Sequence, residues 1–484
     1  MFFCRGTHEG DLVLRLQTEL WYNFAPMDNE DRYGGYTPRR ATRFYVPLLL
    51  QAFSQSLTYP LVGAIASRGT YGVDELTAFT QGQIAMFFIG AIGGGLITTG
   101  MVFARTVAGM AAFRRLNALM MVALLSVQAA CAVGPMGDWI FCHLFNLPRH
   151  LADIASRTML FGVVMQGFFF VRNVPLVALF NARASTEANW ATFVRIIAAF
   201  LCSIAFPRLG WTGADWALAA LTGSVFIELA LSWLFARRYM REIPEGEGVP
   251  LGRQFAFTMP LSLGSALLAF SPVIIALFVG RSANATDMLG LHYVTLGIAN
   301  PVSFAALRMQ TVAIQFPPEY QGDRRLLGFA VVAGLLLGLV PFALSLPGPG
   351  GWYYGTVQNI PPHLLGTALL MSGLYSFIEV IHAIRGRIEG IAAWRNRPNS
   401  VMAGQIAYFV TLTAVAAGLL ALGAPGWVIA IGAIYAAPVA TIAAVYITLA
   451  LPDSTPRSES SARRAWSIHQ SRRHPASAQG HSQT

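Results

Sequence analysis

Residues 44–76 read FYVPLLLQAFSQSLTYPLVGAIASRGTYGVDEL, and residues 257–289 read FTMPLSLGSALLAFSPVIIALFVGRSANATDML. The two apolar stretches match without a gap when Phe44 is aligned with Phe257, and we call this constant difference in residue number the repeat offset. Apolar identities arise easily in such sequences, but a proline, an arginine and an aspartate kept in one register indicate an internal repeat. The identities pair Phe44 with Phe257, Pro47 with Pro260, Leu48 with Leu261, Leu50 with Leu263, Arg68 with Arg281, Asp74 with Asp287 and Leu76 with Leu289.

The composition excludes an ordinary soluble protein. Of the 484 residues, 55% are hydrophobic and only 12% are charged, whereas about a quarter of the residues in a soluble domain are charged. The net charge of +10 could indicate a nucleic-acid partner, but every long stretch between charges is apolar. The chain is therefore expected to be solvated by lipid.

Apolar runs of about 20 residues, the length that crosses a bilayer as a helix, recur along the whole chain. Because the halves repeat and begin on the same side, the sequence predicts an all-α integral membrane protein with about twelve transmembrane helices in two six-helix repeats. The expected spans are 44–66, 77–104, 116–133, 158–181, 189–207, 214–236, 255–279, 289–315, 327–345, 363–385, 401–422 and 426–449.

The distribution of arginine orients the chain. All 33 basic residues are arginine, and 25 of them lie in the two tails and in the loops after the even-numbered helices. The opposite side holds five. Because cytoplasmic loops retain positive charge, both termini are expected in the cytoplasm and the protein in the inner membrane of the cell. We call the side with the 25 arginines the arginine-rich end.

Two tails flank the lobes, and a short linker joins one lobe to the other. The second tail is rich in Ser, Arg, His and Gln, a composition typical of disorder. In the first tail, Leu12, Leu16, Leu20 and Phe24 predict an amphipathic helix on the membrane surface, unless Met27 is the true start. The expected bounds are 1–43 for the first cytoplasmic tail, 44–236 for the first lobe, 237–254 for the cytoplasmic linker, 255–449 for the second lobe and 450–484 for the second tail.

Paired lobes are typical of proteins that work by movement, because two similar lobes can rock around a site near the bilayer middle. Prolines in the first helix of each lobe permit kinks. Glycines in the second helix allow close approach, for which packing is the favoured role. The prolines are Pro47, Pro60, Pro260 and Pro272, and the glycines are Gly90, Gly93, Gly94 and Gly95.

No metal site or cofactor is expected. The four cysteines show no CxxC spacing, the histidines do not gather at metal-ligand intervals, and no Walker A motif is present to bind ATP. A disulfide between Cys131 and Cys142 is the alternative to unpaired burial, which free cysteine favours.

In architecture, about residues 40–450 resemble the multidrug, oligosaccharidyl-lipid and polysaccharide exporter (MOP) superfamily, which includes the MATE transporters. Three short motifs look like its progressive ankylosis branch: Phe44-Tyr45-Val46-Pro47-Leu48, the stretch from Phe87-Phe88 to Gly100-Met101-Val102-Phe103, and Thr258-Met259-Pro260-Leu261.

This resemblance implies alternating access between two six-helix bundles and export of a cytoplasmic solute or a lipid-linked glycan. The ankylosis branch is associated with efflux of pyrophosphate, nucleotide and citrate. The first helix lacks the acidic residue that couples cations in many drug exporters of the superfamily, so the resemblance does not extend to that coupling site.

Five charged residues stand out inside the expected spans, away from their ends: Arg172, Arg195, Glu228, Arg308 and Glu379. Each costs about 3 kcal/mol or more at the bilayer centre and by default marks a functional path or a buried pair. All five fall in the cytoplasmic half of their helices, which predicts a polar vestibule open to the cytoplasm.

One interpretation of these charges is structural. Arg195 would then neutralise Glu228 in the first lobe, and Arg308 would neutralise Glu379 in the second, so that the pairs lock the bundles.

The other interpretation is that the charges bind cargo. Arg172 is left without an acid in the first lobe, and an arginine in a dehydrated cleft suits the two oxygens of a phosphate or carboxylate. We therefore expect an anionic substrate that contacts Arg172, with Asn173 beside it, and Arg308 from the second lobe.

His382 follows Glu379 by one turn on the same helical face. The two side chains could couple transport to protons, since histidine titrates near neutral pH and burial raises the pKa of a carboxyl toward it. A histidine satisfied within the membrane is the alternative.

The sequence predicts a transporter rather than an enzyme. A membrane-embedded transferase, the main alternative from another class, needs paired carboxylates or histidine clusters on substantial loops, and the loops here are short. Within the transporters, a flippase for lipid-linked oligosaccharide or polysaccharide precursors is the alternative to a small-anion exporter. The expected partners are the lipid bilayer and one of these cargoes, with no nucleic acid, and the protein is expected to be a monomer.

Overall fold

The computed structural model describes residues 35–145, 147–320, 322–358 and 360–451. The amphipathic helix expected from Leu12 to Phe24, the start site at Met27 and the tail expected to be disordered beyond Leu451 lie outside these residues. Cys131, Cys142 and Cys202 are unpaired.

Within the described residues the protein is helical throughout, and twelve long segments make up the fold. Ten of them, with α4 joined to α5 and α11 to α12, are long and apolar enough to cross a membrane. With α3 and α13–α14, which carry more polar residues, they give the twelve predicted helices. The segments are α3 (Pro38–Ala66), α4 (Val73–Ala91) with α5 (Gly95–Phe103), α6 (Val107–Ala132), α8 (Arg149–Asn181), α9 (Ser185–Arg208), α10 (Ala214–Arg241), α11 (Leu251–Ala269) with α12 (Ser271–Val279), α13 (Ala285–Leu307) with α14 (Met309–Gln315), α15 (Arg325–Ser345), α17 (Pro362–Trp394), α18 (Pro398–Ala421) and α19 (Gly426–Ala450).

The repeat seen in the sequence extends through the whole fold. Both bounds of α17 follow those of α8 by the repeat offset, and both bounds of α18 follow those of α9 in the same way. The pair α11–α12 likewise begins and ends one repeat offset after α3. Even the short turns match, since α7 (Gly134–Asp138) with the π-helix η1 (Trp139–Leu144) corresponds to α16 (Pro347–Gly350) with η2 (Gly351–Val357).

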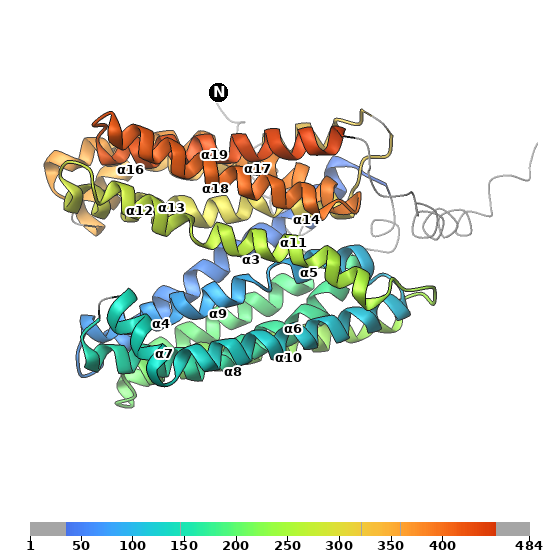
Figure 1. The fold of residues 1–484 in the computed structure, drawn as a ribbon, viewed down its shortest axis with the longest axis horizontal. Coiled ribbons are helices and arrows are strands. Elements are labelled where there is room, and N and C mark those ends of the chain that lie inside the picture. The colour runs from blue at the N-terminus through green and yellow to red at the C-terminus, as the bar shows by residue number, and fades with distance from the viewer. Residues whose placement is uncertain (1–34, 146, 321, 359, 452–484) are drawn as a thin grey trace, which may run out of the picture.

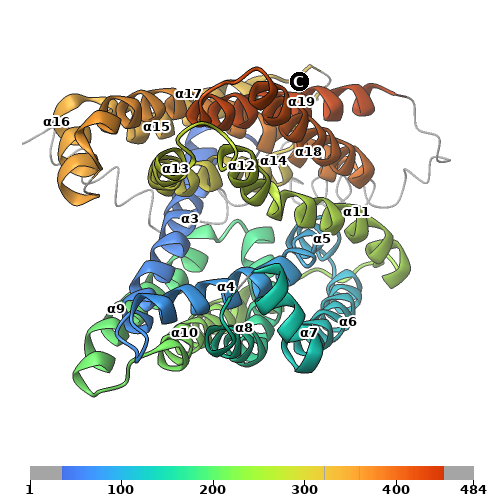
Figure 2. The same cartoon turned by 60° about the vertical axis from the view of Figure 1, so that its left-hand side comes forward.

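The two repeats form two lobes. Figure 1 shows α3 to α10 as one layer and α11 to α19 as the other; the layers approach each other near α5 and α14 and spread apart toward α4 and α16. Figure 2 shows α3, α5 and α11 between the lobes. The end at which the layers approach each other is the arginine-rich end, because it carries the loops after α5, α8, α10, α14 and α17.

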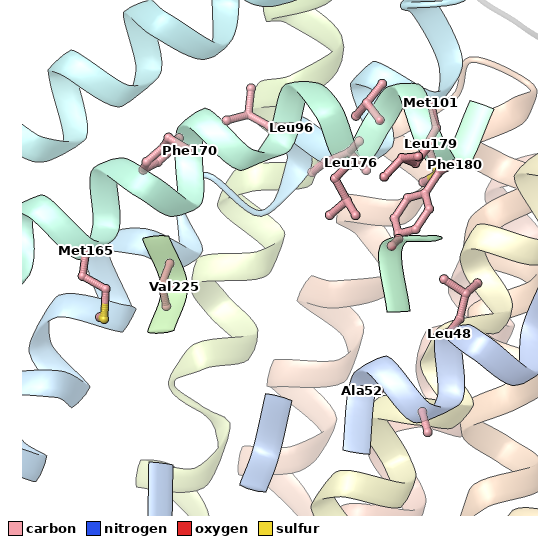
Figure 3. Packing of buried hydrophobic residues seen from close by; sticks show 14 of the residues in the cluster. Leu48, Ala52, Leu96, Met101, Met165, Phe170, Leu176, Leu179, Phe180 and Val225 are labelled. Atoms are coloured by element: carbon pink, nitrogen blue, oxygen red, sulfur yellow. The ribbon is translucent and has the colours of Figure 1, made fainter. Parts of the chain in front are cut away.

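The hydrophobic cores show how the lobes are joined near this end. One core fills the first lobe and continues into the second through Val302, Ala305 and Met309. Figure 3 shows part of it around Phe170 and Leu176 of α8. The other core lies within the second lobe, among α12, α13 and α17 to α19. Among the described residues, the buried core that the lobes share therefore lies near the arginine-rich end, and Phe88 of α4 and Phe270 at the end of α11 add an aromatic contact between the lobes.

The glycines of the second helix serve packing, as predicted. The run that ends at Gly95 separates α4 from α5 and lies against α11 of the other lobe. A Cβ atom on Gly95 would lie 2.8 Å from the carbonyl oxygen of Thr258. This close approach allows the hydroxyls of Thr99 and Thr258 to hydrogen-bond at 2.7 Å. A further break follows Phe270, where Pro272 occupies the first turn of α12.

We expect Gly95→Ala to destabilise the protein, because the new methyl group would meet a backbone oxygen and force α5 away from α11. Overpacking of this kind costs about 1–3 kcal/mol, which would lower the midpoint of thermal unfolding in detergent. Gly223→Ala in α10 is the matched control, because nothing lies within 4 Å of its added Cβ. Equal midpoints for the two variants would contradict the packing role of Gly95.

Candidate functional site

A cavity of about 640 Å³ lies between the lobes. Its walls come from α3, α8 and α9 of the first lobe and from α13 and α14 of the second. The two segments outside the ten candidate membrane spans, α3 and α13–α14, thus both border it. The lining residues are Ala52, Tyr59, Phe169, Arg172, Arg195, Gly297, Asn300, Pro301, Phe304, Leu307, Arg308, Gln310 and Thr311.

In the first lobe, the lining residues Arg172 and Arg195 belong to an arginine–glutamate–arginine cluster whose carboxylate lies behind them. Glu228 Oε2 accepts hydrogen bonds from Arg172 Nη1 at 2.6 Å and from Arg195 Nη1 at 2.9 Å. The Thr192 hydroxyl donates to Glu228 Oε1 at 2.6 Å, and Arg195 Nη2 donates to the Thr58 hydroxyl at 3.2 Å. All five side chains are buried, so the helices α3, α8, α9 and α10 are fixed relative to one another by charge-assisted hydrogen bonds.

Arg308 brings positive charge from the other lobe to the same cavity. It stands at the junction of α13 and α14, seven residues after Pro301, which interrupts the hydrogen bonding of α13 because proline has no N–H group. Three guanidinium groups therefore line the cavity, and the carboxylate of Glu228 compensates one of the two in the first lobe. No carboxylate lies among the described residues that line the cavity.

Two expectations about the first lobe need correction. Glu228 holds both arginines, so the prediction that Arg172 has no acid is wrong, although the predicted pair with Arg195 is present. Asn173 does not line the cavity. Its side chain donates to Asn117 at 3.1 Å, because the next residue on a helix points about 100° away from Arg172.

In the second lobe, the alternative pair of Arg308 with Glu379 is not formed. Glu379 is buried in α17, and its Oε1 accepts a hydrogen bond from Ser303 at 2.9 Å. Its Oε2 and the Nδ1 of the buried His382 have no hydrogen-bond partner among the described residues. Glu379 and His382 share a helical face without forming an ion pair in the described part of the chain.

The cavity is closed at the arginine-rich end. Arg183 Nη2 donates to the carbonyl oxygen of Gln315 at 2.6 Å, and Arg105 Nη2 donates to that of Ile314 at 3.4 Å. The guanidinium of Arg183 also lies 4.0 Å from the centre of the Phe316 ring, whose edge meets Phe44. We call this set the inner contact. The vestibule expected to open at this end is therefore shut in this structure.

The position of Arg183 carries backbone strain. Its φ of 54° is left-handed, a conformation uncommon for residues other than glycine, asparagine and aspartate. The equivalent residue of the second lobe, Asn396, has φ 61° and a side chain suited to it. Arginine is kept in the first lobe at a conformational cost, and its contacts with Gln315 and Phe316 offset that cost.

Sequence reasoning did not find Tyr59, Thr58 or Arg183. Tyr59 and Thr58 are uncharged and lie in a helix whose faces periodicity alone does not separate. Arg183 lies in a loop, where an arginine is ordinarily explained by topology. The signal in the sequence was its repeat counterpart Asn396. Asparagine favours the left-handed conformation, so the repeat indicates a left-handed turn after both α8 and α17.

The fold, rather than the sequence, relates this chain to known proteins. No family model and no curated protein matches the sequence. The eukaryotic MATE transporter AtDTX14 is similar in structure with a TM-score of 0.65 at 14% identity, over 89% of this chain and 99% of its own. A multidrug resistance MATE family transporter of the MOP superfamily, in its outward-facing conformation, has a TM-score of 0.63 at 15% identity, over 91% of this chain and 98% of its own. A MOP superfamily transporter from Pyrococcus furiosus has a TM-score of 0.60 at 14% identity, over 87% of this chain and 97% of its own.

The chain is a multi-pass membrane protein with the twelve-helix fold of MATE transporters. The predicted fold class and the resemblance to the superfamily are confirmed at the level of the fold. The narrower resemblance to the progressive ankylosis branch finds no support among these structures and stays a prediction.

We expect Glu228→Gln to destabilise the first lobe strongly, because it leaves Arg172 and Arg195 buried without a counter-charge. Removing one partner of a buried ion pair costs about 3–5 kcal/mol, which thermal unfolding in detergent measures. Asp138→Asn is the control: Asp138 and Arg149 form an exposed pair, which contributes about 0–1 kcal/mol. A loss no larger than that of the control would mean that the cluster does not hold the lobe.

Proposed function

We propose that the protein is an alternating-access transporter that exports an anionic cytoplasmic solute of the pyrophosphate, nucleotide or carboxylate class. The observation that carries the proposal is the cavity between two repeated lobes, lined by Arg172, Arg195 and Arg308 with no carboxylate among its described lining residues. The fold is that of proteins described as transporters, whose paired lobes suit rocking around a central site.

The arginines suit an anion because they are not all satisfied by the protein. One carboxylate, Glu228, serves two guanidinium groups, and the Nε atoms of Arg172 and Arg195 have no hydrogen-bond partner among the described residues. A phosphate or carboxylate bound between Arg172 and Arg308 would compensate the positive charge that Glu228 leaves on the first-lobe pair, and it would accept hydrogen bonds from guanidinium groups of both lobes. Asn300, Gln310 and Thr311 offer neutral hydrogen bonds in the same cavity.

A structural neighbour offers a precedent for a change of cargo on this fold. For the MOP superfamily transporter from Pyrococcus furiosus, the reverse polarity of the binding pocket suggests a different function. The cavity here, with three arginines, supports a similar departure from drug export. The size of about 640 Å³ suits a small solute, since ligand pockets measure about 300–1,000 Å³.

The conformation also has a place in this cycle. If the arginine-rich end faces the cytoplasm, both termini lie there, and the structure is closed inward and spread outward (Figure 1). This is the state from which an exported solute leaves. Cargo would enter after the inner contact of Arg183 with Gln315 opens.

We further propose that Glu379, with His382 one turn away, couples transport to protons. Burying a carboxylate without a cation is costly, and binding a proton removes that cost. Release of the proton when the inner contact opens would tie the protonation of Glu379 to the movement of the lobes.

The anion proposal is tested by uptake of radiolabelled pyrophosphate and citrate into proteoliposomes. Arg172→Gln should reduce saturable uptake by about tenfold or more, since a lost bidentate contact to a charged group costs about 1.5–3 kcal/mol. Arg172→Lys should recover part of it. Arg149→Gln, which changes an exposed arginine, is the control. Unchanged uptake by a well-folded Arg172→Gln protein would refute the proposal, and transfer of a labelled lipid-linked oligosaccharide without anion uptake would indicate the flippase instead.

The coupling proposal predicts that an imposed pH gradient accelerates anion movement in the natural protein. Glu379→Gln should abolish this acceleration while exchange of labelled for unlabelled anion continues, because exchange needs no net proton movement. The same response to the gradient in both proteins would remove Glu379 from the coupling mechanism.

A further inference from the structure

The second lobe contains a row of buried polar groups that the arginine cavity does not include. On α13, His292 and Thr295 are buried, and Ser303 lies three turns beyond His292 on the same face. Ser303 donates to Glu379 of α17. One turn before Glu379, the buried Tyr375 lies beside Thr295. These five residues, which we call the polar row, follow the interface of α13 and α17.

Most atoms of the polar row that could exchange protons are not hydrogen-bonded. Both ring nitrogens of His292, the Tyr375 hydroxyl and Glu379 Oε2 have no hydrogen-bond partner among the described residues. More than nine in ten buried polar groups in proteins are paired, so a group of exceptions along one interface needs an explanation. Ordered water or a mobile proton supplies one.

The first lobe shows that the fold does not require this row. At the repeat offset, His292 corresponds to Phe79, Thr295 to Gly82 and Ser303 to Gly90, and on α17 Tyr375 corresponds to Gly162 and Glu379 to Gln166. Gly90 packs against the Gln166 side chain as Ser303 does against Glu379. The same backbone positions are thus filled without a titratable group, and only the second lobe carries the row.

Among the described residues, the titratable groups that interact with Glu379 are phenols. Tyr45 of α3 and Tyr435 of α19 interact electrostatically with it, and α15 approaches its backbone with Gly334. Tyr45 donates to the carbonyl oxygen of Ala305 at 3.1 Å, and Tyr435 donates to that of Leu374.

The other members of the row also face phenols. Around Tyr375 lie Tyr354, Tyr408 and Tyr435, and His292 packs near Tyr293. Arg385, on the next turn of α17, is near His382 and is paired with Glu389 at 2.9 Å. No carboxylate other than Glu379 is placed to receive a proton from the row among the described residues.

The row begins at the end where the lobes spread apart. His292 is seven residues into α13, and Ser303 lies about 16 Å farther along the helix at 1.5 Å per residue. In the first turns of α13 and α17, the exposed side chains of Asp287 and His363 lie 3.9 Å apart. A proton from the aqueous phase thus meets titratable groups at this end before it reaches the buried row.

We propose that the polar row conducts protons from the arginine-poor side of the membrane to Glu379. The proposal rests on the proposed coupling role of Glu379. One ring nitrogen of His292 takes up a proton as the other releases one toward the Thr295 hydroxyl. That hydroxyl and the Tyr375 hydroxyl each accept one proton and pass one on, and Glu379 Oε2 receives it, so that the net change is one neutral carboxyl. The Thr295 and Tyr375 hydroxyls are neighbours without hydrogen-bond geometry, and the ring of His292 and Glu379 Oε2 likewise have no hydrogen bond to the row. Bridging waters or side-chain rotations therefore complete each step.

The first experiment follows the Glu379 carboxyl itself by infrared spectroscopy on the full chain in proteoliposomes. The C=O band of the protonated acid is assigned by its loss in Glu379→Gln, and its hydrogen–deuterium exchange is timed after a switch to deuterated buffer. His292→Phe and Tyr375→Phe should slow the exchange by about tenfold or more, in the range that loss of a proton-transfer group produces. Tyr293→Phe, which changes an exposed neighbour, should leave it unchanged.

The outcomes separate the two proposals. If no band is lost in Glu379→Gln at any pH, Glu379 takes up no proton, and both its coupling role and the pathway fall. If the band is present and both row variants exchange at the natural rate, the pathway alone is wrong. His292→Gln serves where His292→Phe fails to fold, as judged by monodisperse elution and helical circular dichroism.

A second readout uses transport. With labelled pyrophosphate as the probe, His292→Phe should lower accumulation driven by a pH gradient relative to anion exchange by about tenfold. An unchanged ratio of the two rates would contradict the pathway. Because the infrared measurement needs no cargo, it remains decisive if pyrophosphate and citrate are not transported.

Discussion

The structure depends on how charge is compensated where lipid excludes water. An uncompensated guanidinium or carboxylate between membrane helices costs several kcal/mol, so every such group needs a partner, a ligand or a proton. In the first lobe, Glu228 accepts from Arg172 and Arg195, which fixes four helices and leaves positive charge in excess at the cavity. In the second lobe, Glu379 has only the hydroxyl of Ser303 as a partner among the described residues. The two lobes solve one problem in opposite ways, with excess positive charge on one side and an acid without a cation on the other.

The repeat makes this contrast informative. Because the helix bounds coincide at a constant offset, each position of one lobe has a counterpart that shows what the backbone alone requires. Arg172 corresponds to Arg385, whose Nε is held by Glu389 one turn away on the same helix. Arg195 corresponds to Tyr408, over which the Arg385 guanidinium packs at 4.8 Å. The lobes share an architecture, and their side chains have taken different roles.

Much of the fold could be predicted from the sequence because membrane spans are encoded locally. The length of each apolar run, the arginine distribution and the repeat gave twelve segments, including α3 and α13–α14, which lie outside the ten candidate membrane spans. The pairing of Arg195 with Glu228 followed from the same few candidates. Glu228 also accepts from Arg172, which lies 56 residues away. This second contact depends on the rotation of α8 about its own axis, which hydropathy does not determine. Asn173 was placed in the site by adjacency in sequence, whereas the helix turns it toward Asn117. The closed inner contact depends on backbone carbonyls of α14, which carry no sequence signal.

Those carbonyl groups have a consequence for the movement of the lobes. In the closed state, the oxygens of Ile314 and Gln315 at the end of α14 accept hydrogen bonds from Arg105 and Arg183, so all four groups are satisfied without solvent. When the lobes part, these two hydrogen bonds break together, although Arg105 Nε keeps the carbonyl oxygen of Met101 in its own lobe. Water must then take the place of the partner that each of the two carbonyl oxygens has lost. The inner end must therefore become wet as it opens. The balance between the two conformations is thus set partly by the availability of water, so that an excluded osmolyte on the cytoplasmic side would hold the protein shut without binding to it.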